Sequence, residues 1–259
     1  MRKVFVIALS FFVLLSSLFA VFMEEDLSAL QFGFSGKVHT VQIEIAKLGA
    51  ELLISDPETL TFNEKGFLIS RETEEVKIEY FYDDSGRLRR KDFINRDGTV
   101  FQRVEVLYED DHYDAVAFDD SGIELERTRY WINSEERTLI FSVETETGVS
   151  TNTLFFDENG RKSERYSLIR ENVSELDMEV NIVVESTFTY DSNGHLVGEK
   201  TVVRVRREGR EQASEFRSRI DILLTDEQGN PVRELRRTEF LDSSSAPEEF
   251  IYSRVYTYY

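Results

Sequence analysis

Three histidines are the side chains of this sequence best suited to proton transfer or metal binding near neutral pH. They are His39, His112 and His195, and none belongs to a helical metal motif such as H-E-x-x-H. The chain has no cysteine to complete a zinc site or to act as a nucleophile. We therefore interpret each histidine as a packing or surface residue. We predict no catalytic residue, no metal site and no bound cofactor.

The densest group of carboxylates lies between residues 109 and 114. Glu109, Asp110, Asp111 and Asp114 surround His112, and carboxylate oxygens are ligands that Ca²⁺ prefers. The segment lacks the spaced aspartates, the central glycine and the final glutamate of a calcium loop. The favoured interpretation is a solvated turn between two strands.

Loops that bind phosphate or present a nucleophilic serine are also missing. No segment matches the G-x-G-x-x-G or Walker patterns. The segment Gly33-Phe34-Ser35-Gly36 does not have the G-x-S-x-G spacing of a nucleophile elbow. With 50 acidic residues in the chain, pairs of carboxylates carry little information about acid–base catalysis. We expect a protein that is not an enzyme.

The most regular feature of the sequence is a recurrent Asp-x-x-Gly segment. An aspartate that begins a type I turn accepts hydrogen bonds from the backbone that follows it. A glycine three residues later adopts the left-handed conformation that closes a hairpin through a β-bulge. Seven of the 13 glycines have Asp or Asn three residues before them. The five best copies, which we predict as structural turns, are Asp83 to Gly86, Asp119 to Gly122, Asp157 to Gly160, Asp191 to Gly194 and Asp226 to Gly229.

The segments that flank these turns alternate between apolar and polar residues, as half-buried strands do. Val76, Ile78, Tyr80 and Tyr82 illustrate the alternation before one turn. The glycines of the five turns lie 36, 38, 34 and 35 residues apart, which indicates a repeat array. We predict an all-β fold, an antiparallel meander of about 12–16 strands that forms an extended, twisted or curled sheet.

The turn and its flanks resemble the YD repeats of Rhs-type proteins. The resemblance is best at Tyr82–Leu88 and Tyr190–Leu196, where Tyr-Asp-x-x-Gly is followed by Arg or His and then Leu. It extends over about residues 60–235 and concerns the repeat unit rather than one particular protein. It implies a long, curling antiparallel sheet built from hairpins.

The N-terminus is typical of a secretory signal. Met1-Arg2-Lys3 is positively charged, and Val4 to Phe22 is almost entirely apolar. We predict a signal peptide, in helical form, over residues 1–20, a lead segment over 21–36 and a single β-repeat domain over 37–259. The length of the apolar run leaves a retained membrane anchor as the alternative. The resulting localisation is periplasmic or secreted, with no transmembrane domain after signal cleavage.

The overall charge excludes another class of function. The chain has 31 Lys and Arg against 50 Asp and Glu, a formal net charge of −19, which repels nucleic acid. Its hydrophobic content of 41% is sufficient for a folded core. We expect no nucleic-acid partner, and we expect the exported fold to be stable without disulfides.

A membrane-spanning barrel requires an apolar outer face on every strand. After the turn at Gly86, simple alternation places Arg89 and Lys91 on one face of the strand and Arg90 and Asp92 on the other. A Lys or Arg that faces the middle of the bilayer costs roughly 2–4 kcal/mol. This pattern favours a sheet in contact with water over a barrel that spans a membrane.

Two functions remain open. The leading hypothesis is a non-enzymatic β-repeat protein that presents its extended sheet for binding or scaffolding, with an envelope protein, glycan or lipid as partner. The alternative is a periplasmic carrier whose curled sheet shelters a lipid or acyl chain. That carrier requires one shared concave face for a set of aromatic side chains, namely Tyr80, Tyr82, Phe156, Phe188 and Tyr190.

Positive charge is concentrated in three segments of this acidic chain, of which the first contains Arg87, Arg89, Arg90 and Lys91 and the other two are C-terminal. They suit an anionic glycan or lipid, or else cross-strand pairing with the glutamates interleaved among them. Both interpretations apply to Arg204, Arg206, Arg207, Arg210, Arg233, Arg236 and Arg237.

Overall fold

The structure is a computed structural model that describes residues 31–32, 34–49, 53–145, 148–173, 178–207, 210–241 and 246–259. The predicted signal helix and most of the predicted lead segment lie outside these residues. Among the described residues, no helix is long and apolar enough to cross a membrane. The strands are β1 (Val38–Leu48), β2 (Leu53–Ile54), β3 (Glu58–Phe62), β4 (Leu68–Glu72), β5 (Val76–Tyr82), β6 (Leu88–Asn95), β7 (Val100–Tyr108), β8 (His112–Asp119), β9 (Glu124–Asn133), β10 (Thr138–Thr145), β11 (Gly148–Phe156), β12 (Lys162–Val173), β13 (Met178–Tyr190), β14 (Leu196–Arg207), β15 (Arg210–Thr225), β16 (Pro231–Phe240) and β17 (Glu248–Tyr258).

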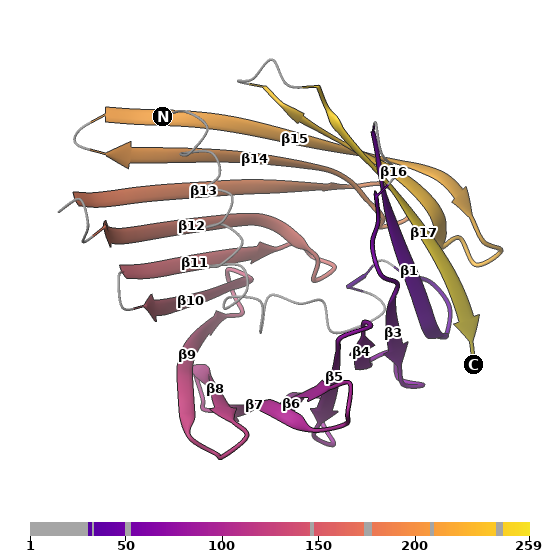
Figure 1. Cartoon of the computed structure of the whole chain (residues 1–259), viewed down its shortest axis with the longest axis horizontal. Coiled ribbons are helices and arrows are strands. Elements are labelled where there is room, and N and C mark those ends of the chain that lie inside the picture. Colours follow the sequence, from indigo (N-terminus) through magenta and orange to yellow (C-terminus); the bar gives the residue numbers. More distant parts are fainter. Residues whose placement is uncertain are drawn as a thin grey trace.

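These strands form one antiparallel sheet that closes on itself as a barrel (Figure 1). Strands β3 to β16 each pair with the next strand along the chain. β1 closes the ring, because it pairs with β17 along one edge and with β3 along the other. The two-residue β2 also pairs with β1, beyond the part of β1 that faces β3, so the barrel wall consists of the other 16 of the 17 strands. An even number of strands allows the first and the last to meet antiparallel.

The predicted extended or curled sheet is therefore wrong. An open sheet would leave unpaired N–H and C=O groups along its first and last strands. Here the register joins β1 to β17 from Val38 opposite Tyr258 to Leu48 opposite Glu249, and these two edges satisfy each other. The alternation within each strand contains no signal for this pairing, because the partners are about 200 residues apart in the sequence.

The Asp-x-x-Gly segments form hairpin turns. The Asp83 carboxylate accepts hydrogen bonds from the backbone N–H of Ser85 at 3.0 Å and of Arg87 at 2.9 Å. The Ser85 hydroxyl also donates to Asp83, and these bonds hold the pKa of that carboxyl well below its usual range. Gly86 has a φ of +83°, in the left-handed region that only glycine adopts without strain. Corresponding bonds to the backbone recur at Asp119, Asp157, Asp191 and Asp226.

A β-bulge follows these turns. Tyr82 pairs with Leu88 while the preceding Phe81 pairs with Arg90, so β6 has one extra residue at this point. The extra residue places Leu88 and Lys91 on the same face of the sheet. Equivalent register shifts occur where β3 joins β4, β8 joins β9, β11 joins β12 and β13 joins β14.

Asn230 attaches the segment before β1 to the barrel. It is fully buried, and its side chain accepts a hydrogen bond from the Ser35 N–H at 2.5 Å and donates to the Ser35 carbonyl at 2.9 Å. Its amide also donates to the Tyr258 hydroxyl at 2.8 Å, and that hydroxyl contacts Asp226. Phe34 is buried against the barrel wall as a result. Phe34 and Ser35 therefore belong to the folded domain.

Candidate functional site

The register divides the barrel wall into two faces of different chemistry. On β5, Ile78, Tyr80 and Tyr82 share one face, and Lys77 and Glu79 share the other. Because the described wall is a single layer of strands, extensive burial of a whole face occurs on the concave side, where neighbouring side chains converge. The apolar face is the buried one, so it is the inner face.

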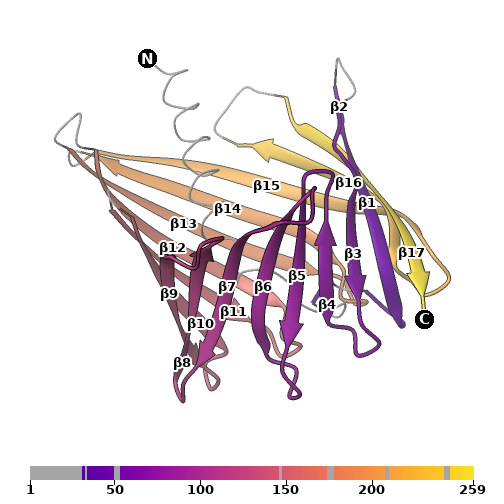
Figure 2. The ribbon, with the colours of Figure 1, turned by 60° about the horizontal axis from the view of Figure 1, so that its bottom comes forward.

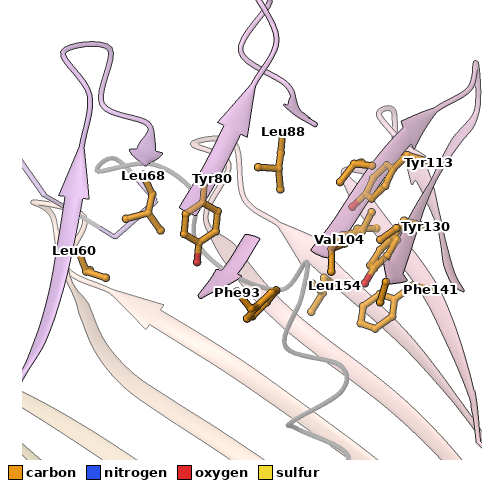
Figure 3. Packing of buried hydrophobic residues seen from close by; sticks show 14 of the residues in the cluster. Leu60, Leu68, Tyr80, Leu88, Phe93, Val104, Tyr113, Tyr130, Phe141 and Leu154 are labelled. Carbon is orange, nitrogen blue, oxygen red and sulfur yellow. The ribbon is translucent and has the colours of Figure 1, made fainter. Parts of the chain in front are cut away.

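A continuous apolar cluster covers the inner face of one half of the barrel. Figure 3 shows its side chains gathered on the same side of successive strands. The labelled members come from β3 to β11 and are all at most 9% exposed. They are Leu60, Leu68, Tyr80, Leu88, Phe93, Val104, Tyr113, Tyr130, Phe141 and Leu154.

A second, separate apolar cluster lies on the inner face of the other half. Ile182, Val203 and Val205 are its buried members, from β13 and β14. Figure 2 shows these strands behind the front wall of β3 to β9. The described side chains thus make two apolar walls that do not merge into one core.

A barrel of 16 strands is too wide for the side chains of its wall to fill. About eight strands give an interior that side chains can fill, whereas about 16 leave a channel. The burial pattern agrees with this width, because many inner apolar side chains are only partly buried. Those that border the two clusters include Ile43, Ile78, Tyr108, Phe156, Ile169, Val180, Val184 and Phe216.

The five aromatic residues named for the carrier hypothesis share this inner face. Tyr80 and Tyr82 lie there on β5, Phe156 on β11, and Phe188 and Tyr190 on β13. Two of their hydroxyls are bound to the wall itself: the Tyr82 hydroxyl donates to the Leu68 carbonyl at 2.7 Å, and the Tyr190 hydroxyl donates to the Lys162 carbonyl at 2.9 Å. They share this face although Tyr80 and Tyr190 are more than 100 residues apart in the sequence and lie on strands that are not neighbours.

The outer face has ladders of ion pairs between neighbouring strands. Asp92 on β6 lies 2.9 Å from Arg103 on β7, and Asp114 on β8 lies 2.8 Å from Arg129 on β9. The hydrogen bond from Arg129 holds the pKa of Asp114 below its ordinary value. Further pairs on the outer face of the other half are Lys200–Glu215, Arg204–Glu185 and Arg237–Glu249.

A polar group interrupts the apolar inner face on β16 and β17. Arg254 donates to Glu234 over 3.0 Å, and their side chains are only 9% and 7% exposed. Arg236 lies on the same face, 4.0 Å from Glu234, with its guanidinium 4.3 Å from the centre of the Tyr252 ring. Sequence reasoning missed this group. One signal for it is present in the sequence. Arg254 alternates with Tyr252 and Tyr256 along β17, so it lies on the same face of the strand as these aromatic residues.

The histidines do not meet at one site. His39 lies against the Tyr259 ring, 4.5 Å between centroids. The His112 ring is 2.6 Å from Asp111, and the buried His195 is 3.2 Å from the turn residue Asp191. Within the described ranges, no group of three or more acidic or histidine side chains has the geometry to hold a metal ion.

The five predicted turn sites do not converge either. In a meander, successive hairpins alternate between the two rims of the barrel. The turns at Asp83, Asp157, Asp191 and Asp226 therefore lie at one rim, and the turn at Asp119 lies at the opposite rim. Their carboxylates are occupied by the backbone of their own turns, so these residues shape the hairpins.

Comparison with known proteins gives structural similarity alone. No protein-family model and no curated relative matches the sequence. A porin-like protein from Bacteroides vulgatus is similar at a TM-score of 0.44 and 10% identity, over 87% of this chain and 99% of that one. A porin-like protein from Bacteroides uniformis has a TM-score of 0.40 and 11% identity, over 86% and 98%. The Tc holotoxin pore of Photorhabdus luminescens, with the mutation TccC3-D651A, has a TM-score of 0.27 and 12% identity, over 78% and 14%.

Proposed function

We propose that this chain is an exported, non-enzymatic carrier whose barrel encloses the hydrocarbon chain of a lipid. The observation that carries the proposal is a pair of apolar clusters on the inner face of a barrel of 16 strands, which is too wide for its own side chains to fill. Apolar surface in contact with water is unfavourable in proportion to its area. A hydrocarbon chain that covers these walls removes that contact.

The outer face supports a protein that stays in water. Charged side chains occur on it at the middle of the strands, as at Asp92, Asp114 and Glu185. Lipid contact at these positions would remove paired charges from water, at roughly 2–4 kcal/mol for each Lys or Arg at the membrane midplane. The proposed carrier therefore works in the periplasm or outside the cell, in agreement with the signal peptide predicted for residues 1–20.

The closed barrel removes the structural assumption of the other hypothesis, in which an extended sheet is presented for binding or scaffolding. That hypothesis assumed an extended sheet, and here the two edges of the sheet pair with each other. The carrier hypothesis required one concave face shared by a set of aromatic residues, and the register provides that face. The closed geometry thus favours the second function over the first.

The test is recovery of the bound molecule from protein purified after export, without detergent. We expect native mass spectrometry to show lipid at near-equal stoichiometry and solvent extraction to release it. Folded protein recovered without any bound lipid would contradict the proposal.

Neighbouring valines on β13 provide a matched pair of variants. Val184 lies on the inner face opposite Val203, and Val183 lies on the outer face opposite Arg204. Val184→Trp should weaken uptake of the fluorescent fatty acid cis-parinaric acid, because the indole occupies space that the chain requires. Val183→Trp should leave uptake unchanged. Equal uptake by both variants would argue against a binding site inside the barrel.

A further inference from the structure

On β16 and β17 the inner face has two arginines and two glutamates, and Lys47 on the neighbouring β1 adds a third cation. Glu234 is the acidic partner of Arg254 at 3.0 Å, and Arg236 reaches the same carboxylate only at 4.0 Å. The other inner acid of this region, Glu248, is bound to Lys47 at 2.6 Å. One guanidinium is thus in excess within this part of the wall.

The two arginines also have unused hydrogen-bonding capacity. Arg254 uses its two terminal nitrogens on the Pro231 carbonyl, at 3.3 Å, and on Glu234. The buried Nε–H groups of Arg254 and Arg236 have no acceptor among the described residues. A buried donor without an acceptor is costly, and guanidinium groups match carboxylate and phosphate oxygens in geometry.

Apolar side chains surround these charges. Arg236 pairs across the sheet with Ile220 on β15 and with Phe250 on β17. Arg254 stands opposite Ile43 on β1. Such a wall suits a molecule with one anionic group and a long apolar part, because free inorganic anions would gain nothing from the apolar neighbours.

We infer that Arg236 and Arg254 bind the anionic head of an amphiphile of the fatty-acid type, whose hydrocarbon chain lies along the apolar inner face. This inference rests on the proposed carrier function and specifies its ligand. Arg254 is held in place by Glu234, and Arg236, whose side chain is 32% exposed, is the more accessible of the two cations. The head group completes the hydrogen bonding of both, and the chain covers the partly buried apolar residues nearby.

The experiment compares oleate with oleyl alcohol, which has the same chain and no charge, by displacement of cis-parinaric acid from the exported protein. We expect the native protein to prefer oleate by about tenfold or more, as a charged hydrogen bond implies. Arg236→Gln should abolish this preference and leave the affinity for oleyl alcohol unchanged, while Arg236→Lys should retain part of it. Arg237→Gln, on the outer face of the same strand, is the matched control and should behave as the native protein does.

Each outcome distinguishes the two proposals. Equal affinity of the native protein for oleate and oleyl alcohol, or a preference that survives in Arg236→Gln, overturns the anionic-head inference and leaves the carrier standing. Failure to bind either molecule, by folded protein with native circular dichroism, overturns both. Displacement of oleate by millimolar inorganic phosphate, without any binding of oleyl alcohol, would indicate a site for free anions and would also overturn the inference.

Discussion

The Arg254 guanidinium donates to the Glu234 carboxylate over 3.0 Å on the inner face of the barrel, where both side chains are more than nine-tenths buried. The pair joins β16 to β17, close to the seam where the barrel closes onto β1. Removal of Glu234 leaves the buried Arg254 without its counter-ion, and removal of Arg254 leaves Glu234 with only the longer, 4.0 Å contact to Arg236. A buried pair is therefore much more sensitive to single than to double substitution.

The first prediction concerns this pair. Arg254→Met should lower the free energy of unfolding by about 3–5 kcal/mol, because it leaves the buried Glu234 carboxylate with only the 4.0 Å contact to Arg236. The double variant Arg254→Met with Glu234→Leu should be clearly more stable than the single one. Urea unfolding followed by far-ultraviolet circular dichroism measures both. Equal losses in the single and double variants would show that the two charges are not coupled.

The second prediction tests closure of the barrel. Gln42 on β1 and Val255 on β17 are directly opposite in an antiparallel pair, where Cα atoms are about 4.5–5.5 Å apart. That separation suits a disulfide. Because the chain has no cysteine, Gln42→Cys with Val255→Cys should cross-link almost completely under mild oxidation. Non-reducing gels and intact mass measure the product.

The control for this cross-link places the second cysteine on β11. Thr151 lies on the outer face there, on a strand that is not a neighbour of β1. Gln42→Cys with Thr151→Cys should therefore remain reduced within one chain. Similar cross-linking of the two pairs, or failure of the first, would contradict the closed barrel.

The third prediction compares two turn glycines with the same backbone conformation. Gly86 and Gly122 both have a φ of +83°, so alanine at either position costs about 1–2 kcal/mol. A Cβ at Gly122 would meet nothing within 4 Å, whereas a Cβ at Gly86 would be 2.8 Å from the Phe67 ring. That ring stacks on Tyr82 and must move. Gly86→Ala should therefore destabilise the protein more than Gly122→Ala, by thermal or urea unfolding.

A double variant isolates the steric part of this effect. With Phe67→Ala in the background, the additional cost of Gly86→Ala should fall to that of Gly122→Ala. A cost that does not depend on Phe67 would mean that backbone strain alone explains the loss.

Hairpin turns can be predicted from a few consecutive residues, whereas closure of the barrel cannot. Four consecutive residues, from Asp83 to Gly86, contain the hydrogen-bond acceptor and the left-handed glycine that a turn requires. The pairing of Val41 with Tyr256 depends instead on the combined twist and stagger of all the strands between them. No local pattern encodes that sum, which is why the strand patterns alone predict an extended, twisted or curled sheet.

The β-bulges change which residues of a strand share a face of the sheet, so simple alternation assigns some residues to the wrong face. Simple alternation along β6 puts Leu88 with Arg90 and Asp92, and so charges both faces equally. The bulge after the turn instead places Leu88 with Lys91 and Phe93 on the inner face and leaves Arg90 and Asp92 outside. One extra residue reverses every face assignment that follows it.

The candidate site was the least predictable part. Glu234 and Arg254 lie on different strands, and each resembles the many charged residues of this chain. Their significance comes from burial on an inner face, which depends on closure of the barrel. The carrier hypothesis named five aromatic residues that share that face, but it had no means of finding the charges among them.

The last prediction concerns acid. Hydrogen bonds lower the pKa of Asp83 and Asp119 below the ordinary value of 3.8; at Asp83 the largest contribution comes from the Ser85 hydroxyl, and at Asp119 from the Ile123 backbone. Since these groups titrate at lower pH when folded, the unfolded chain binds protons first as the pH falls. Their stabilisation is complete above about pH 5 and is lost as the pH falls from there through the unfolded and then the folded pKa values. Urea midpoints should therefore decrease between pH 5 and pH 2. Asp119→Asn should flatten that decrease more than Asp120→Asn, which removes the same charge one residue further along, and equal slopes for the two variants would contradict this account of the turns.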